Sequence, residues 1–98
     1  MELKLALKVD DLDNVATIFA NGITDGTQVE MRDKKGVSEI ITVCGDVPYG
    51  HKIAVQDIAR GEGIIKYGER IGRASCDIRK GDYVHVHNLE ALRGRGDL

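Results

Sequence analysis

Aromatic residues are scarce in this chain of 98 residues, which has no tryptophan, three tyrosines and one phenylalanine. A hydrophobic core must therefore be built from isoleucine, valine, leucine and alanine. The two cysteines, Cys44 and Cys76, are too few for the disulfide framework of a small secreted domain. Both lie in apolar stretches typical of strands, so we expect buried, unreactive thiols.

An excess of positive charge is also absent, because the formal net charge is −2 and the isoelectric point is near 5.9. No basic field is available to attract a nucleic-acid backbone. No apolar run approaches the roughly 18–20 residues of a transmembrane helix, and the N-terminal segment alternates charge with leucine, unlike a signal peptide. We expect one cytoplasmic domain with no membrane or nucleic-acid partner.

Alternating patterns in the first half of the chain predict β-strands. Leucine and valine occupy every second position from 3 to 9, which predicts a half-buried strand with these side chains on its inner face. Residues 27–32 alternate again, and the turn at 33–36 leads into a strand over 38–44, so we expect a hairpin. Residues 15–20 are apolar and fit either a buried strand or a short helical turn.

A short internal repeat organises the second half. Asp57-Ile-Ala-Arg-Gly-Glu62 recurs twenty positions later as Asp77-Ile-Arg-Lys-Gly-Asp82. Each copy predicts a strand, a tight turn closed by a glycine with positive φ, and another strand. Two copies are too few for a solenoid and favour a pseudo-symmetric β-barrel or clip. The chain as a whole is predicted to be mainly β.

Three segments of the second half carry a resemblance to a known family. They are Gly50–Ile58, which includes His51-Lys52, then Ile65–Gly68, and Gly81–Asn88, which ends in His-Val-His-Asn. In this order and spacing they resemble the SAF region of altronate and galactarate dehydratases. The resemblance implies a SAF-type β-clip with short helical turns over residues 1–88. Residues 89–98 are then expected to form a flexible tail that docks on a partner.

The resemblance also implies a function. We expect the small subunit of a sugar-acid dehydratase, a carbon–oxygen hydro-lyase that is inactive without a separate large subunit. A divalent metal, iron or manganese, would be supplied mainly by that subunit. Two alternatives stay open, namely a non-catalytic SAF ligand-binding module and the small subunit of a sulfolactate-type lyase. Homo-oligomerisation also stays open.

His85 and His87 are the first candidate site residues. On a strand, residues two apart project from one face, with Val84 and Val86 turned to the core. Two imidazoles on one side can transfer protons, bind a carboxylate or contribute to a metal site, although no third ligand has zinc-site spacing. On spacing alone, the pattern favours surface histidines with no functional role. The resemblance favours a catalytic role for both.

Further candidates follow from the resemblance. It implies a catalytic role for His51, and substrate binding by Lys52, Lys66, Tyr67 and Asn88. A lysine ammonium suits a sugar-acid carboxylate, while Tyr67 equally fits a core aromatic with its hydroxyl at the edge. The sequence departs from the altronate enzymes at Tyr83, where a histidine or tryptophan is common, so no role is assigned there.

Overall fold

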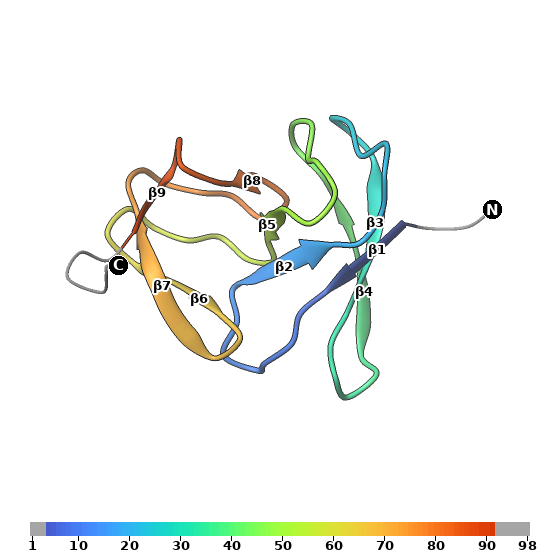
Figure 1. Cartoon of the computed structure of the whole chain (residues 1–98), viewed down its shortest axis with the longest axis horizontal. Coiled ribbons are helices and arrows are strands. Elements are labelled where there is room, and N and C mark those ends of the chain that lie inside the picture. Colours follow the sequence, from blue (N-terminus) through green and yellow to red (C-terminus); the bar gives the residue numbers. More distant parts are fainter. Residues whose placement is uncertain (1–3, 92–98) are drawn as a thin grey trace.

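Nine strands make up the chain in a computed structural model that describes residues 4–91 (Figure 1). They are β1 Lys4–Leu7, β2 Val15–Ile18, β3 Gln28–Arg32, β4 Ser38–Thr42, β5 Lys52–Ala54, β6 Gly63–Lys66, β7 Glu69–Ala74, β8 Tyr83–Val84 and β9 Leu89–Ala91. The predicted mainly-β class is confirmed. No helix occurs within residues 4–91, so the expected short helical turns are not found there, nor is any helix that could cross a membrane.

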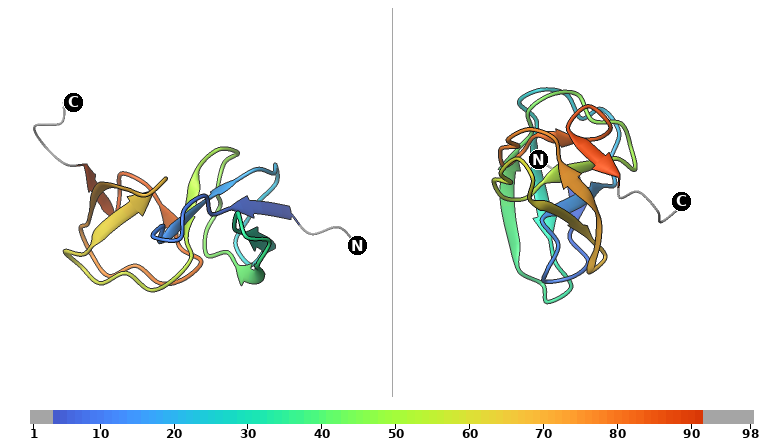
Figure 2. Two further views of the ribbon diagram at one scale, coloured as in Figure 1. Left: turned by 90° about the horizontal axis from the view of Figure 1, so that it is seen from below. Right: turned by 90° about the vertical axis from the view of Figure 1, so that its left-hand side faces the viewer.

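The strands form two sheets. Six strands follow the order β4-β3-β1-β2-β5-β8, and three follow the order β6-β7-β9. Strand β1 pairs in parallel with β3, whereas the other neighbours are antiparallel. Figure 2 shows the smaller sheet at the end of the molecule opposite the β3–β4 hairpin. The predicted hairpin over residues 28–42 is confirmed, and the undecided segment at 15–20 contains a buried strand, β2.

The inner face of β1 differs from the prediction. Ala6 is fully buried, while Leu5 and Leu7 are only half-buried. The cause is the position of β1 between two strands: Ala6 pairs with Ile18 on one side and Met31 on the other. Both neighbours fill that face with large side chains, so a small residue fits between them and the leucines face outward. Position 3 lies outside the described residues.

The internal repeat forms a pair of interlocked turns. Ile58 and Ile78 pair through two backbone hydrogen bonds of 2.8 Å. The aspartate before each isoleucine then crosses over, so that Asp57 Oδ1 accepts from the Lys80 N–H and Asp77 Oδ1 accepts from the Arg60 N–H, both at 2.9 Å. The two turns therefore stabilise one another reciprocally.

We number each turn from its isoleucine, so that Glu62 and Asp82 are the fifth residues. Within each turn, the side chain of the fifth residue accepts a second hydrogen bond. Glu62 accepts from the Ala59 N–H at 2.7 Å, and Asp82 accepts from the Arg79 N–H at 2.9 Å. The glycine before each acid has positive φ, and at Gly81 an added Cβ would lie 2.2 Å from the Thr42 carbonyl oxygen. Close backbone approach therefore requires glycine at this turn.

The first half of the chain contains another pair of such turns, which the sequence did not reveal, at residues 22–27 and 46–51. In chain order this is the first pair of turns, and the internal repeat forms the second pair. Ile23 pairs with Val47, and Gly26 and Gly50 have positive φ. These turns read Ile-Thr-Asp-Gly-Thr and Val-Pro-Tyr-Gly-His, so their motif is less regular than that of the second pair. The pseudo-symmetry therefore extends over most of the chain.

Two buried clusters form the core. One is built around Ile18, Val29, Ile41 and Ile53 in the larger sheet, and the other packs the smaller sheet against the second pair of turns. Strand pairing continues past the predicted boundary at residue 88, because β9 pairs with β7. The remainder of the predicted tail, residues 92–98, lies outside the described residues.

Candidate functional site

Four rings form a cluster on one face of the molecule. Tyr83 is at its centre, with ring centroids 5.7 Å from His51, 5.6 Å from His85 and 5.5 Å from His87. His51 and His85 lie 4.9 Å apart. The Tyr83 hydroxyl is 2.7 Å from Nδ1 of His51, so the two groups share a hydrogen bond. The three predicted catalytic histidines are therefore brought together.

Strand pairing brings these residues together. His51 immediately precedes β5, and β5 pairs with β8 so that Ile53 is opposite Tyr83. His51 also occupies the fifth position of its turn, where Thr27, Glu62 and Asp82 use their side chains to accept from the N–H of the second residue.

At the His51 turn, the second residue is Pro48, which has no N–H. The His51 imidazole consequently has no such bond to make and is available to Tyr83. The contact between the two turns is also altered. Asp46, which precedes Val47, accepts from the Asp25 N–H of the other turn, but the equivalent residue before Ile23 is Gly22. Glycine has no side chain that could bond to the other turn, so the His51 turn is the least constrained of the four.

The predicted strand through His87 ends early. Strand β8 stops at Val84, residues 86–88 form a turn, and Val86 is 79% exposed rather than turned to the core. The cause is Asn88, whose Oδ1 accepts from the His85 N–H and whose Nδ2 donates to the Tyr83 carbonyl, both at 2.9 Å. The buried Asn88 amide thus holds the turn that carries the histidines, and its predicted substrate contact stays a prediction.

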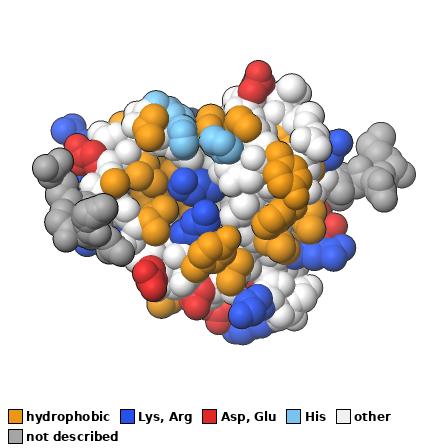
Figure 3. All heavy atoms as spheres, in the orientation of Figure 1, with side chains coloured by type: hydrophobic (Ala, Val, Ile, Leu, Met, Phe, Trp, Pro, Cys, Tyr) orange, Lys and Arg blue, Asp and Glu red, His pale blue; other side chains and the backbone are white. Residues whose placement is uncertain are grey.

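Two lysines lie beside the rings. Lys52 is on β5, and partial burial, followed by repulsion from Lys66, lowers the pKa of its ammonium below the usual value. Neither lysine forms an ion pair with a carboxylate within residues 4–91. Figure 3 shows basic side chains next to the histidines on this face, surrounded by apolar ones. The pair therefore forms an electropositive surface next to the imidazoles.

Lys66 is positioned by the β6–β7 hairpin. Its Nζ lies 5.0 Å from the centroid of the Tyr67 ring, a cation–π contact. Tyr67 has φ of 55°, which is strained for a residue with a side chain and fits the two-residue turn of this hairpin. Asn14 bonds to both Gly63 and Ile65 of β6 at 2.8 Å, which fixes the hairpin against β2.

His85 has an imidazole that resists protonation. Partial burial is the main reason that its pKa is lowered, and the positive charges of His51, Lys52 and His87 lower it further. A neutral imidazole can accept a proton, which is the property required of a general base.

A metal centre does not fit the described residues on their own. Within residues 4–91 no three histidine, cysteine or acidic side chains are arranged to hold a metal ion. His85 and His87, the weak metal candidates, both contact the Tyr83 ring, and metal binding by this pair stays a prediction.

A cavity of about 350 Å³ adjoins the ring cluster. It is lined by Cys44, Gly45, Cys76, Asp77, Asp82, Tyr83, His87 and Asn88. The prediction of buried thiols is wrong, because both cysteines are free and exposed. Val43 takes the core position next to Cys44, and Cys76 lies in the connection after β7.

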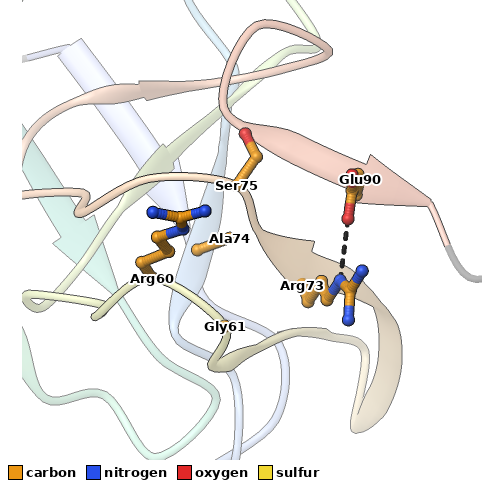
Figure 4. Close-up of a pocket in the computed structure, with 6 residues that line it drawn as sticks. All are labelled: Arg60, Gly61, Arg73, Ala74, Ser75 and Glu90. Carbon is orange, nitrogen blue, oxygen red and sulfur yellow. Dashed lines mark hydrogen bonds and ion pairs between the residues drawn. The ribbon is translucent and has the colours of Figure 1, made fainter.

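A second cavity, of about 260 Å³, lies at β7 and β9 (Figure 4). Arg60 and Ser75 line it together with the ion pair of Arg73 and Glu90, whose Nε and Oε1 atoms are 2.7 Å apart. No predicted site residue lines this cavity. The ring cluster with its adjoining cavity is therefore the candidate site.

Sequence reasoning missed the central residue, Tyr83. Its alternation with His85 was the available signal in the sequence, but only the β5–β8 register brings the hydroxyl to His51.

Residues 4–92 match the family described as the altronate/galactarate dehydratase SAF domain, and the chain belongs to this family. It is 43% identical over 82 residues to altronate dehydratase of Escherichia coli (strain K12), covering 84% of this chain and 15% of that protein. It is also 40% identical over 53 residues to (2R)-sulfolactate sulfo-lyase subunit alpha of Paracoccus pantotrophus, covering 54% of this chain and 79% of that protein. The subunit alpha of Chromohalobacter salexigens is 49% identical over 47 residues, covering 48% of this chain and 50% of that protein.

Proposed function

We propose that this SAF domain is the small subunit of a sugar-acid dehydratase of the altronate or galactarate type, acting with a separate large dehydratase subunit. The observation that carries the proposal is the juxtaposition of Lys52 and Lys66 with the His51–Tyr83–His85 cluster. Family membership and the relatives named subunit alpha of a lyase support a partner subunit.

The lysine pair suits the substrate carboxylate. Partial burial and, after it, repulsion from Lys66 lower the pKa of Lys52, so a carboxylate bound between the two ammonium groups offsets both effects. A lysine ammonium acts on a carboxylate as a compact point charge. The carboxylate would then lie beside the imidazoles and orient the rest of the sugar acid across them.

Dehydration of such an acid removes the proton α to the carboxylate and expels the β-hydroxyl, which leaves as water. His85 has the neutral imidazole that accepts a proton, whereas the hydrogen-bonded His51–Tyr83 pair can deliver one to the leaving hydroxyl. The large subunit would supply the remaining groups, including the divalent iron or manganese. His87 lines the adjoining cavity and would contact the distal part of the substrate.

A sulfolactate-type lyase is the second candidate. The two relatives named sulfolactate sulfo-lyase subunit alpha are matched over 50% and 79% of their own lengths. Sulfolactate also carries a carboxylate, so the same lysine pair could hold it. A non-catalytic SAF ligand-binding module would use the lysine pair in the same way, and activity separates these alternatives.

Reconstitution with the large subunit tests the proposal. We expect the complex to dehydrate altronate or galactarate, and the isolated chain to have no activity. Lys52→Met should raise the KM of the complex at least tenfold, while the control Lys34→Met, in the exposed β3–β4 turn, leaves it unchanged. Turnover by the isolated chain contradicts the subunit role, sulfolactate cleavage alone selects the second candidate, and an inactive complex supports the non-catalytic module.

A further inference from the structure

Large apolar side chains are exposed around the candidate site. Phe19, Tyr49, Tyr67 and Val86 are 40%, 56%, 55% and 79% exposed, and we call these four residues the apolar collar. Figure 3 shows hydrophobic side chains bordering the basic and histidine side chains on this face. A monomeric surface rarely gathers large apolar groups around a polar centre unless something binds there.

Each collar residue is linked to a site residue. Tyr49 precedes His51 by two positions, and its ring packs edge-on against Phe19 with centroids 6.1 Å apart. Tyr67 lies under the Lys66 ammonium, and Val86 lies between the two histidines of the turn after β8. The collar therefore borders the candidate site on several sides.

Strand β1 extends this apolar surface. The Phe19 N–H donates to the Leu5 carbonyl at 2.9 Å, so the two residues are opposite one another on the face away from Ala6. Leu5 and Leu7 are the residues that the alternating pattern predicted to be buried, yet they are half-exposed. A second protein surface would bury them, which gives a physical reason for leucine at outward-facing positions.

We propose that the apolar collar is the docking surface for the large dehydratase region, so that the ring and lysine cluster becomes one wall of a composite active site at the interface. This inference rests on the proposed function. Aromatic side chains around a polar centre resemble the anchors of protein interfaces. The altronate dehydratase relative indicates this occupant, because the matched segment is only 15% of its length and the other 85% lies outside that segment.

Charge favours the same occupant over a second copy of this chain. Lys52 and Lys66 lie inside the collar without a carboxylate partner within residues 4–91. A second copy would bring two further lysines to the same place, and like charges across an interface oppose association. A partner that carries acidic groups or the bound sugar acid opposite these lysines would instead be attracted. Docking would also exclude water from the rings and strengthen their electrostatic interactions.

Binding of the large dehydratase subunit from the same organism tests the inference. We compare wild type with Phe19→Ser and Tyr49→Ser, and with the control Val37→Ser, whose side chain is also exposed but follows the distant β3–β4 turn. Isothermal titration calorimetry should show at least tenfold weaker binding for both collar variants and less than a twofold change for the control. Thermal melting by circular dichroism checks that all variants fold.

Unchanged affinity of folded Phe19→Ser and Tyr49→Ser complexes overturns the docking surface, and if these complexes are active the proposed function still stands. A wild-type chain that binds no large subunit overturns both. Self-association of the isolated chain that the collar variants abolish, with binding of the large subunit unchanged, assigns the collar to a homodimer and also overturns the inference.

Discussion

Tyr83 and His51 meet because two nearby residues lack groups that the other turns possess. Pro48 has no amide hydrogen for the His51 side chain to accept, and Gly22 has no carboxylate to bond across the turn pair. In the other three turns the side chain of the fifth residue accepts a hydrogen bond from the N–H of the second residue of the same turn. At the scale of single residues, His51 therefore occupies a position that stabilises the turn elsewhere, but its side chain bonds to Tyr83 instead.

His85 offers a direct measurement at this scale. Its pKa is lowered by partial burial and by the charges of His51, Lys52 and His87. We expect an NMR titration to give a midpoint below the ordinary value of about 6.5, and Lys52→Met to move it upward. Lys34→Met, far from the ring cluster, should leave it unchanged, and an unperturbed His85 midpoint in wild type would contradict this account of the site.

The lowered pKa of His85 also sets the sign of a change in stability. A folded-state pKa below the unfolded value means that the unfolded chain binds the proton more tightly. The contribution of His85 to stability is thus present above the unfolded pKa and is lost as the pH falls through it. Acidification below about pH 6.5 should lower the melting temperature, and less so in His85→Gln.

At the scale of elements, the tight turns carry much of the architecture. Each pair joins segments some twenty residues apart through backbone hydrogen bonds between the first apolar residues, Ile23 with Val47 and Ile58 with Ile78. Side-chain carboxylates then satisfy backbone donors that exposed turns would otherwise leave to water. Short strands can therefore be combined into two sheets without helices.

A double substitution tests whether the His51 turn differs from the other three because Pro48 lacks the N–H to which their fifth side chains bond. His51→Asp alone places a carboxylate opposite Pro48, which has no N–H to donate. Adding Pro48→Ala restores the donor, so the double variant should exceed His51→Asp in stability by about 1 kcal/mol. Urea unfolding measures the difference, and Pro48→Ala in the wild-type background is the control for proline itself, since it should stabilise little or destabilise.

If the double variant is no more stable than His51→Asp, the turns are similar in shape only, and the release of His51 by Pro48 is not supported. Either result is independent of catalysis, because both chains are compared as isolated domains.

At the scale of the whole molecule, β9 closes the smaller sheet. It pairs with β7 from Gly72 to Ala74, and an added Cβ at Gly72 would lie 2.3 Å from the Glu90 carbonyl oxygen. The Arg73–Glu90 ion pair joins the same strands (Figure 4). The boundary predicted after Asn88 therefore separates β9 from the sheet in which it is paired.

Two truncations separate the contribution of β9 from that of residues 92–98. A chain ending at Ala91 keeps every described strand and should unfold like the full chain. A chain ending at Asn88 loses the β7–β9 pairing and should be less stable by at least about 1 kcal/mol, as expected when an element's contacts are removed. Urea unfolding compares the two, and equal stability would mean that β9 contributes no net free energy. Docking was predicted for the whole tail, residues 89–98. Only the chain that ends at Ala91 is suited to testing it, because that chain keeps β9 paired with β7.

The sequence by itself determined the mainly-β class, the β3–β4 hairpin, the second pair of turns and the family. These features depend on local patterns, namely alternation, glycine spacing and a repeated motif, which are visible over a few residues. It also predicted His51, His85 and His87 as site residues, because they lie in two short motifs of the family resemblance, His51-Lys52 and His85-Val-His-Asn88.

Tertiary structure alone decided which face of a strand is buried and which groups meet. Ala6 rather than Leu5 entered the core because of the strands on both sides of β1, and Cys44 was exposed because Val43 took the core position. Tyr83 reached His51 through the register of β5 and β8, which joins residues 32 apart. Such contacts depend on how elements pair and pack across the molecule, and no local pattern encodes them.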